Sequence, residues 1–109
     1  MYQPNKSYDG VPTLIDFKSS RKKKTEQQIG GYYRQTTLYQ MMFEEMTGIR
    51  LELGCIIMGV DEIEPGKVGS ATFDVIFGDH RKTVIDEVCQ IQRSKGIIID
   101  VEECYDRFL

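Results

Sequence analysis

The sequence contains few histidines and cysteines, the residues from which zinc sites and disulfide frameworks are built. Its single histidine is His80, so a site made of several histidines, or a catalytic triad, has little to draw on. The three cysteines, Cys55, Cys89 and Cys104, are an odd number, lie far apart and form no Cys-x-x-Cys pair. This pattern favours reduced thiols in an intracellular, cytoplasmic protein over a disulfide framework or a zinc site.

Long hydrophobic segments are also missing. No run of about 18 apolar residues is present, so we expect no transmembrane helix and no membrane partner. The first ten residues, MYQPNKSYDG, lack the apolar core of a signal peptide. The remaining composition is ordinary for a globular protein, and 109 residues suit one domain with one modest core. We therefore expect a single α/β domain over residues 1–109.

The net charge of −3 hides an asymmetry between the two halves of the chain. Residues 1–50 hold eight Lys/Arg and five Asp/Glu, which gives +3, and residues 51–109 hold six and twelve, which gives −6. A basic first half is what a surface facing nucleic acid requires. For the short run Arg21–Lys24, chance clustering on a solvated loop is the alternative.

A short apolar strand is predicted at residues 13–18, TLIDFK. Because side chains alternate along a strand, Asp16 and Lys18 project from one face, and Ile15 and Phe17 from the other. A carboxylate and an ammonium at this spacing suit metal-dependent phosphodiester chemistry. In that chemistry the acid holds a divalent cation, and the amine orients a water or stabilises charge on the phosphorus.

Polar segments precede and follow this strand. Upstream, the Asp9-Gly10 pair predicts a hairpin turn that joins residues 2–3 to the strand. Downstream, residues 19–31 predict a polar and basic loop, with Thr25 and Gln28 as candidates for a capping box.

The main helix is predicted from about residue 32 to residue 47, with Gly48 as its left-handed stop. Its buried face is predicted to be an apolar stripe at helical spacing: Leu38, Tyr39, Met42 and Met46. Gln35 extends that stripe, and a buried amide without partners costs roughly 1–3 kcal/mol. Gln35 therefore has a partner at a site, or it caps a neighbouring backbone group while Tyr39 is ordinary core.

The second half of the chain predicts two strands and the acidic connection between them. The first strand covers residues 50–59, with one face made of Leu51, Leu53, Cys55 and Ile57, and the run 55–58 buried on both faces. Residues 60–69 predict a turn-rich, acidic loop. The second strand covers residues 69–77, with an apolar face made of Ala71, Phe73, Val75 and Phe77.

An amphipathic helix is predicted from residue 80 to residue 94, with Asp79 as its N-cap and Gly96 at its end. Its buried stripe is predicted to be Val84, Ile85, Val88 and Ile91. Residues 97–101 predict a short strand or an extended tail, and residues 102–109 a last helical turn or two.

Two segments together resemble a known family. Residues 14–20, LIDFKSS, are followed by a basic stretch and then by residues 33–39, YRQTTLY. Asp-x-Lys-Ser followed by Gln-x-x-x-Tyr on a helix resembles the RecB-type branch of the PD-(D/E)XK nuclease superfamily, in particular the phage-encoded and mitochondrial genome maintenance exonucleases. The likeness covers roughly residues 12–58. It implies part of a restriction-endonuclease-like core, a mixed β-sheet flanked by helices, and an origin in a phage genome is in keeping with it.

The resemblance also implies roles for the motif residues. Asp16 would ligate Mg²⁺ or Mn²⁺, with the Phe17 backbone carbonyl as a further ligand. Lys18 would position and activate the attacking water. Gln35 and Tyr39 would contact the phosphate backbone or steady the site. The implied DNA path follows hydroxyl and basic side chains, which fits a sequence-independent electrostatic grip: Ser19, Ser20, Arg21, Lys22, Lys23, Lys24 and Arg34.

One feature of the family is missing, namely its first metal-binding aspartate in a Gly-x-x-Asp strand before the hairpin. Asp9 falls in the expected hairpin turn and is poorly placed as a substitute. With one carboxylate, Mg²⁺ would keep most of its waters and bind weakly. We therefore expect the C-terminal half of a DNA exonuclease, a split-gene or truncated product completed by an N-terminal nuclease fragment or by self-association.

Two other readings remain open. In the first, the chain is a non-catalytic DNA-binding or protein-interaction module of the same fold, in which Asp16 and Lys18 form a structural salt bridge. In the second, it is a small α/β scaffold whose motif match is accidental.

Overall fold

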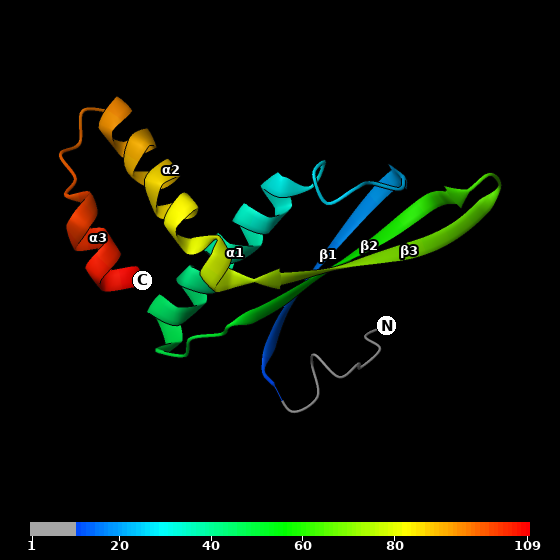
Figure 1. Ribbon diagram of the computed structural model, residues 1–109, viewed down its shortest axis with the longest axis horizontal. Helices are drawn as coiled ribbons and strands as arrows, with labels where there is room; N and C mark the ends of the chain where they lie inside the picture. The colour runs from blue at the N-terminus through cyan, green and yellow to red at the C-terminus, as the bar shows by residue number, and fades with distance from the viewer. Residues whose placement is uncertain (1–10) are drawn as a thin grey trace.

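Three strands form one mixed sheet in the computed structural model, which describes residues 11–109 (Figure 1). They are β1 (Thr13–Lys22), β2 (Leu53–Glu64) and β3 (Lys67–Ile76), in the order β1-β2-β3. β1 runs parallel to β2, and β2 antiparallel to β3. Parallel neighbours need a crossover connection, which helix α1 (Gly30–Thr47) supplies. The predicted α/β class, with a mixed sheet flanked by helices, is confirmed.

Strand β1 ends at Lys22 and not at residue 18, so the prediction of a loop beginning at residue 19 is wrong. The longer strand follows from its partner, since the pairing with β2 continues from Thr13 opposite Leu53 to Lys22 opposite Glu62. Lys22 and Glu62 also form an ion pair, and opposite charges on neighbouring strands support their pairing. Part of the basic stretch therefore stands on a strand.

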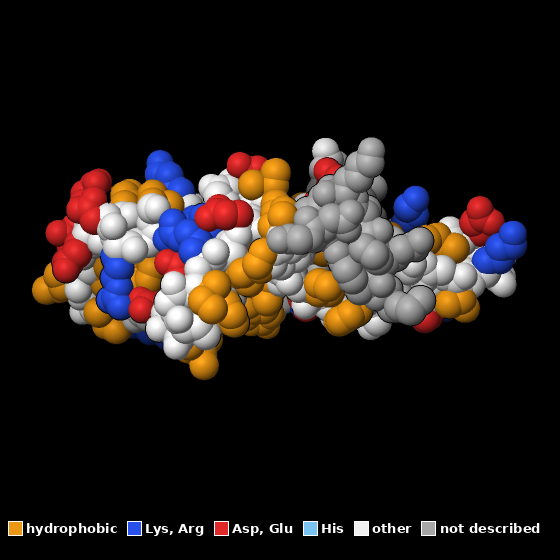
Figure 2. Space-filling model, turned by 90° about the horizontal axis from the view of Figure 1, so that it is seen from below, with side chains coloured by type: hydrophobic (Ala, Val, Ile, Leu, Met, Phe, Trp, Pro, Cys, Tyr) orange, Lys and Arg blue, Asp and Glu red, His pale blue; other side chains and the backbone are white. Residues whose placement is uncertain are grey.

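Strands β2 and β3 are joined by a two-residue turn at Pro65 and Gly66. Gly66 has φ of 75°, and a proline followed by a glycine with positive φ is the pattern of a type II turn. The predicted acidic loop over residues 60–69 is therefore wrong, because both strands continue to the turn. Acidic and basic side chains lie together at this tip (Figure 2), where Lys67 Nζ is 3.4 Å from Glu64 Oε2.

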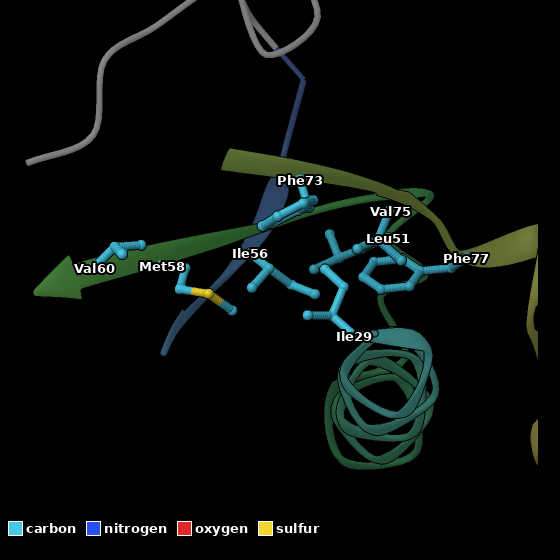
Figure 3. Close-up of a cluster of buried hydrophobic side chains, with 8 residues drawn as sticks. All are labelled: Ile29, Leu51, Ile56, Met58, Val60, Phe73, Val75 and Phe77. Atoms are coloured by element: carbon cyan, nitrogen blue, oxygen red, sulfur yellow. The ribbon is translucent and has the colours of Figure 1, made fainter. Parts of the chain in front are cut away.

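The core lies on one face of the sheet, between the strands and the beginning of α1 (Figure 3). Eight buried side chains form it: Ile29, Leu51, Ile56, Met58, Val60, Phe73, Val75 and Phe77. The apolar face predicted for β3 is confirmed by Phe73, Val75 and Phe77. On β2 the predicted burial of both faces over residues 55–58 is confirmed in part, since Cys55, Ile56 and Met58 are buried and Ile57 is half-buried. The predicted core side is wrong, because the core cluster takes Ile56 and Met58 and not the alternate residues of the strand. Residues 55–58 are all apolar, so the sequence contains no alternation of polar and apolar residues that would show which face of β2 lies against the core.

A turn closed by a capping box precedes helix α1, and a left-handed glycine ends it. Before it, the Thr25 backbone N–H donates to Gln28 Oε1 at 2.8 Å and the Gln28 N–H donates to Thr25 Oγ1 at 3.3 Å, which is the capping box that was anticipated. The helix begins at Gly30 and not at residue 32. Gly48 ends it in the left-handed conformation, with φ of 74° and its N–H bonded to the Glu44 carbonyl, as predicted.

The buried face of α1 differs from the predicted apolar stripe. Its buried residues are Thr36, Thr37, Gln40 and Met41. Tyr39, Met42 and Met46 are 44%, 53% and 83% exposed. Together with Leu38, the two methionines line a groove of about 380 Å³ between α1 and the later helices. The polar residues can be buried because each has a hydrogen-bond partner; Thr37 Oγ1, for example, donates to the Tyr33 carbonyl at 2.7 Å.

The chain closes with the short 3-10 helix η1 (Phe77–Asp79) and helices α2 (Arg81–Ser94) and α3 (Val101–Phe108). The predicted cap Asp79 is wrong, since Asp79 belongs to η1 and the cap position of α2 is His80, whose side chain makes no capping bond. Of the predicted stripe, Val84 and Ile85 are buried, whereas Val88 and Ile91 are 38% and 54% exposed.

The last helix takes its cap from an acidic residue. Asp100 Oδ1 accepts from the Glu102 backbone N–H at 3.0 Å, and α3 begins at Val101. A strand over residues 97–101 is therefore not formed, and the predicted C-terminal helical turns are confirmed. Helices α2 and α3 pack on α1 through a second apolar cluster that includes Met41, Val84, Ile85 and Cys89.

Three further predictions concern the chain as a whole. The proposed Asp9-Gly10 turn and the strand before it lie outside the described residues. None of the helices within residues 11–109 has the length and hydropathy needed to cross a bilayer. Cys55, Cys89 and Cys104 carry free thiols.

Candidate active site

Strand β1 presents Asp16 and Lys18 on the sheet face that α1 covers. In the parallel register they lie beside Ile56 and Met58 of β2, and both of these are fully buried. Phe17, between them, points to the opposite face and is 65% exposed. The prediction that the acid and the amine share one face is therefore confirmed.

The Lys18 ammonium lies between an amide oxygen and a carboxylate. Its Nζ donates to Gln35 Oε1 at 2.6 Å and lies 3.4 Å from Asp16 Oδ2. The side chains of Lys18 and Asp16 are only 21% and 17% exposed. Hydrogen bonds that involve a charged group are shorter and stronger than neutral ones, so these contacts orient the amine. The crossover from β1 to α1 thus brings together three of the four motif residues.

Thr36 belongs to the same group, although the sequence analysis did not identify it. Its side chain is fully buried, and its Oγ1 donates to Asp16 Oδ2 at 3.2 Å. Consecutive residues of α1, Gln35 and Thr36, therefore contact the amine and the acid of β1, respectively. Only its position directly after Gln35 in the sequence could have pointed to Thr36. The helix was interpreted from its apolar residues, and that pattern gives a threonine no role.

Tyr32 is a second residue that the sequence analysis missed. The Lys18 Nζ lies 5.1 Å from the centre of the Tyr32 ring, and the Lys24 Nζ lies 5.9 Å from it. A cation at this distance is attracted to the ring. Since Tyr32 stands one turn before Gln35 on α1, helical spacing was the signal that could have found it.

Tyr39, the fourth motif residue, stands apart from these contacts. It lies one turn beyond Gln35 on α1 and is 44% exposed. Its position leaves it available to a molecule that approaches along the helix.

The residues implied for the DNA path follow the site along β1 and into the next loop. Ser19 and Arg21 are exposed but, by strand alternation, project with Phe17 from the face opposite Lys18, whereas Ser20 Oγ donates to the Lys22 carbonyl at 2.6 Å. After the strand, Lys23 is exposed and Lys24 is half-buried.

Two of the implied DNA contacts are ion-paired within the chain. Lys22 pairs with Glu62, and the Arg34 Nε lies 3.0 Å from Glu87 Oε1 on α2. Both cations are well exposed, at 68% and 41%. Because exposed ion pairs contribute only about 0–1 kcal/mol, a phosphate could replace either acidic partner.

Asp16, the acidic residue of the site, supplies only some of the ligands that a metal ion needs. Asp16 offers one carboxylate, and the Phe17 carbonyl is the only other ligand that the family resemblance implies. Within residues 11–109, no three His, Cys, Asp or Glu side chains lie close enough together to hold a metal ion. Mg²⁺ is commonly bound through one or two carboxylates together with substrate phosphates and water. Asp16 and the Phe17 carbonyl would hold one side of such a site.

Tyr33, two residues before Gln35 in the sequence, has a phenol whose pKa is shifted. Burial raises the pKa of its phenol, and the negative charge of Glu26 raises it further. The phenol therefore stays protonated at neutral pH and is no general base. Its ring stacks on His80 with 5.4 Å between the centroids, which joins α1 to the beginning of α2.

Comparison of the chain with protein-family models, with curated proteins and with solved structures gives no match.

Proposed function

We propose that this chain supplies the Asp-x-Lys strand and the glutamine-bearing helix of a metal-dependent DNA exonuclease, as the C-terminal half of a PD-(D/E)XK core. The observation that supports this most strongly is the contact of Lys18 Nζ with both Gln35 Oε1 and Asp16 Oδ2, at 2.6 and 3.4 Å. Residues that the family resemblance groups into one site are in contact although they belong to different elements.

Each residue has a defined part in this proposal. Asp16 holds Mg²⁺ or Mn²⁺, with the Phe17 carbonyl beside it. When bound, the cation neutralises phosphate charge and lowers the pKa of a coordinated water. Lys18, oriented by Gln35, stabilises the negative charge that develops on the phosphate oxygens. Tyr39 contacts the DNA backbone further along α1.

The missing ligands are proposed to come from a second segment. Because residues 11–109 hold no group of three acidic, histidine or cysteine ligands, a second carboxylate must be brought in. An N-terminal nuclease fragment, or a second copy of the chain, is the proposed source. The chain alone would then bind the cation weakly and cut DNA poorly or not at all.

The DNA path is proposed to follow the basic residues that come after Lys18 in the chain, at the end of β1 and in the loop beyond it. Arg21, Lys23 and Lys24 would contact phosphates directly. Lys22 and Arg34 would exchange their acidic partners for phosphate. Contacts of this kind bind any sequence and weaken as salt is added.

A non-catalytic DNA-binding module is the second candidate, and one observation favours it. Asp16 and Lys18 form an ion pair on the strand, as expected if both had become structural. In that case DNA binding would depend on salt but not on a divalent cation.

The two candidates are separated by titrating end-labelled DNA with the full chain, with and without Mg²⁺ or Mn²⁺, and following fluorescence anisotropy and cleavage. The nuclease proposal expects the cation to strengthen DNA binding by wild type but not by Asp16→Asn, and any cleavage to be lost in Lys18→Ala. Lys95→Ala, which removes the same charge as Lys18→Ala at the residue that follows α2, should behave as wild type. Metal-independent binding would favour the module, and cleavage that survives Lys18→Ala would refute the assignment of the site.

A further inference from the structure

Two adjacent threonines of α1 use their hydroxyl groups differently. Thr36 and Thr37 are both fully buried. Thr37 Oγ1 donates to the Tyr33 carbonyl one turn earlier in its own helix, at 2.7 Å, which is the ordinary bond of a helical threonine. Thr36 Oγ1 instead donates across to Asp16 Oδ2 on β1, at 3.2 Å.

The contacts of the Asp16 carboxylate are asymmetric. Oδ2 accepts from Thr36 Oγ1 and lies 3.4 Å from Lys18 Nζ. Both contacts involve this one oxygen, and within residues 11–109 no hydrogen bond or ion pair of Oδ1 is found. Among the described residues the carboxylate is therefore held through one oxygen only.

We infer that Thr36 is a positioning residue for Asp16, which fixes the carboxylate so that Oδ1 faces the cation. This inference rests on the proposed function of the site. Carboxylates that ligate metals are usually hydrogen-bonded to partners that do not touch the metal, and loss of such a partner typically costs about 10–100-fold in metal affinity or activity. Thr36 has the geometry of such a partner, because it contacts Asp16 and is itself sealed from solvent.

The neighbouring threonine provides a matched control. Thr36→Val removes the hydroxyl that contacts Asp16 and keeps the shape of the side chain. Thr37→Val makes the same chemical change at the next residue of the helix, at equal burial. Thr36→Ser keeps the hydroxyl and removes only a methyl group. A merely structural role for buried threonines would affect Thr36→Val and Thr37→Val alike.

The first measurement concerns the orientation of the Asp16 side chain and needs no metal. Three-bond NMR couplings to its carboxyl carbon report the population of its χ1 rotamers. We expect one rotamer in wild type, Thr37→Val and Thr36→Ser, and rotamer averaging in Thr36→Val. A single unchanged rotamer in Thr36→Val, or averaging in Thr36→Ser, would overturn the inference. If Thr36→Val does not fold, Thr36→Ser and Thr36→Ala serve as the pair that keeps or removes the hydroxyl.

The second measurement uses Mn²⁺ alone as the probe, with free Mn²⁺ followed by electron paramagnetic resonance. We expect the dissociation constant to rise about 10-fold in Thr36→Val, at the lower end of the range for such partners, and less than about 2-fold in Thr37→Val. Equal weakening by both valines would overturn the positioning role. Equal Mn²⁺ binding by wild type and Asp16→Asn would instead refute the metal site of the proposed function, whatever the couplings show.

Discussion

The Arg81 guanidinium Nη2 lies 3.1 Å from the Gln40 side-chain carbonyl Oε1, and both residues are buried. This contact joins the first turn of α2 to the buried face of α1. Arg81 also donates to the Leu51 carbonyl at 2.9 Å, and its Nη1 lies 3.4 Å from Glu52 Oε2. One buried cation therefore satisfies polar groups from both helices and from the segment that leads into β2.

Arg81→Met should lower the free energy of unfolding by about 2–4 kcal/mol. The change leaves the Gln40 and Leu51 oxygens buried without a donor, and each such group costs roughly 1–3 kcal/mol. Urea denaturation followed by circular dichroism measures the difference. The control is Lys95→Met, because Lys95 is exposed and directly follows the same helix. It should change stability by less than about 0.5 kcal/mol. Equal effects would mean that the Arg81 contacts contribute nothing beyond surface charge.

Two glycines of β2 should respond in opposite ways to alanine. A Cβ at Gly54 would lie 2.5 Å from Phe77 Cζ and 3.3 Å from the Leu14 carbonyl oxygen, whereas a Cβ at Gly59 would meet only the Lys18 carbonyl oxygen, at 4.0 Å. Gly54→Ala should therefore cost about 1–3 kcal/mol through overpacking. Gly59→Ala should be neutral or stabilise by up to about 1 kcal/mol, because alanine restricts the unfolded chain. Thermal unfolding of both variants tests the contrast, and destabilisation by Gly59→Ala would contradict it.

The fold was predictable from the sequence where local chemistry decides it. The left-handed stop at Gly48 and the apolar alternation of β3 were of this kind. The extent of β1, and the continuation of β2 and β3 up to the turn at Gly66, were not, because they depend on how β2 pairs with both neighbours. The buried face of α1 was predicted wrongly for a similar reason. Polar residues such as Thr37 and Gln40 can be buried only when partners from other elements or turns satisfy them, and those partners are not adjacent in sequence.

Residue spacing predicted which side chains of the site share a face, but not which of them are in contact. Strand alternation placed Asp16 and Lys18 on one face, the helix pattern left Gln35 with two alternatives, and the family resemblance joined the three. No pattern predicted that Thr36 would contact Asp16, because that contact depends on the distance between α1 and β1. The ion pair of Arg34 with Glu87 likewise depends on the packing of α2 against α1.

Glu44 should contribute to stability in a pH-dependent way. A hydrogen bond from Arg50 holds the pKa of Glu44 below its ordinary value of 4.5. A lowered pKa in the folded state means that the contribution is full above the unfolded value and is lost as the pH falls through the folded value. Glu44→Gln should therefore lower the free energy of unfolding by about 0.5–1 kcal/mol at pH 7 and by progressively less as the pH falls below the ordinary value of 4.5.

The comparison for Glu44 is Glu64→Gln, which removes a largely exposed pair with Lys67 at the hairpin tip. It should change stability by less than about 0.5 kcal/mol at pH 7. Urea titrations of both variants between pH 3 and 7 provide the measurement. A Glu44→Gln effect that stays constant over this range would show that its cause is packing and not charge.

The basic stretch beside the candidate site should set the salt dependence of DNA binding. The triple change of Arg21, Lys23 and Lys24 to alanine removes three proposed phosphate contacts, each of which steepens the dependence of log K on log salt by about one. The slope should therefore become shallower by up to about 3, and affinity at low salt should fall by at least 10-fold. The matched control removes the same charge from α2 and the residue that follows it, through alanine at Lys82, Arg93 and Lys95. If both triple variants lose affinity equally, DNA binding follows net charge, and β1 and its loop are no specific path for the backbone.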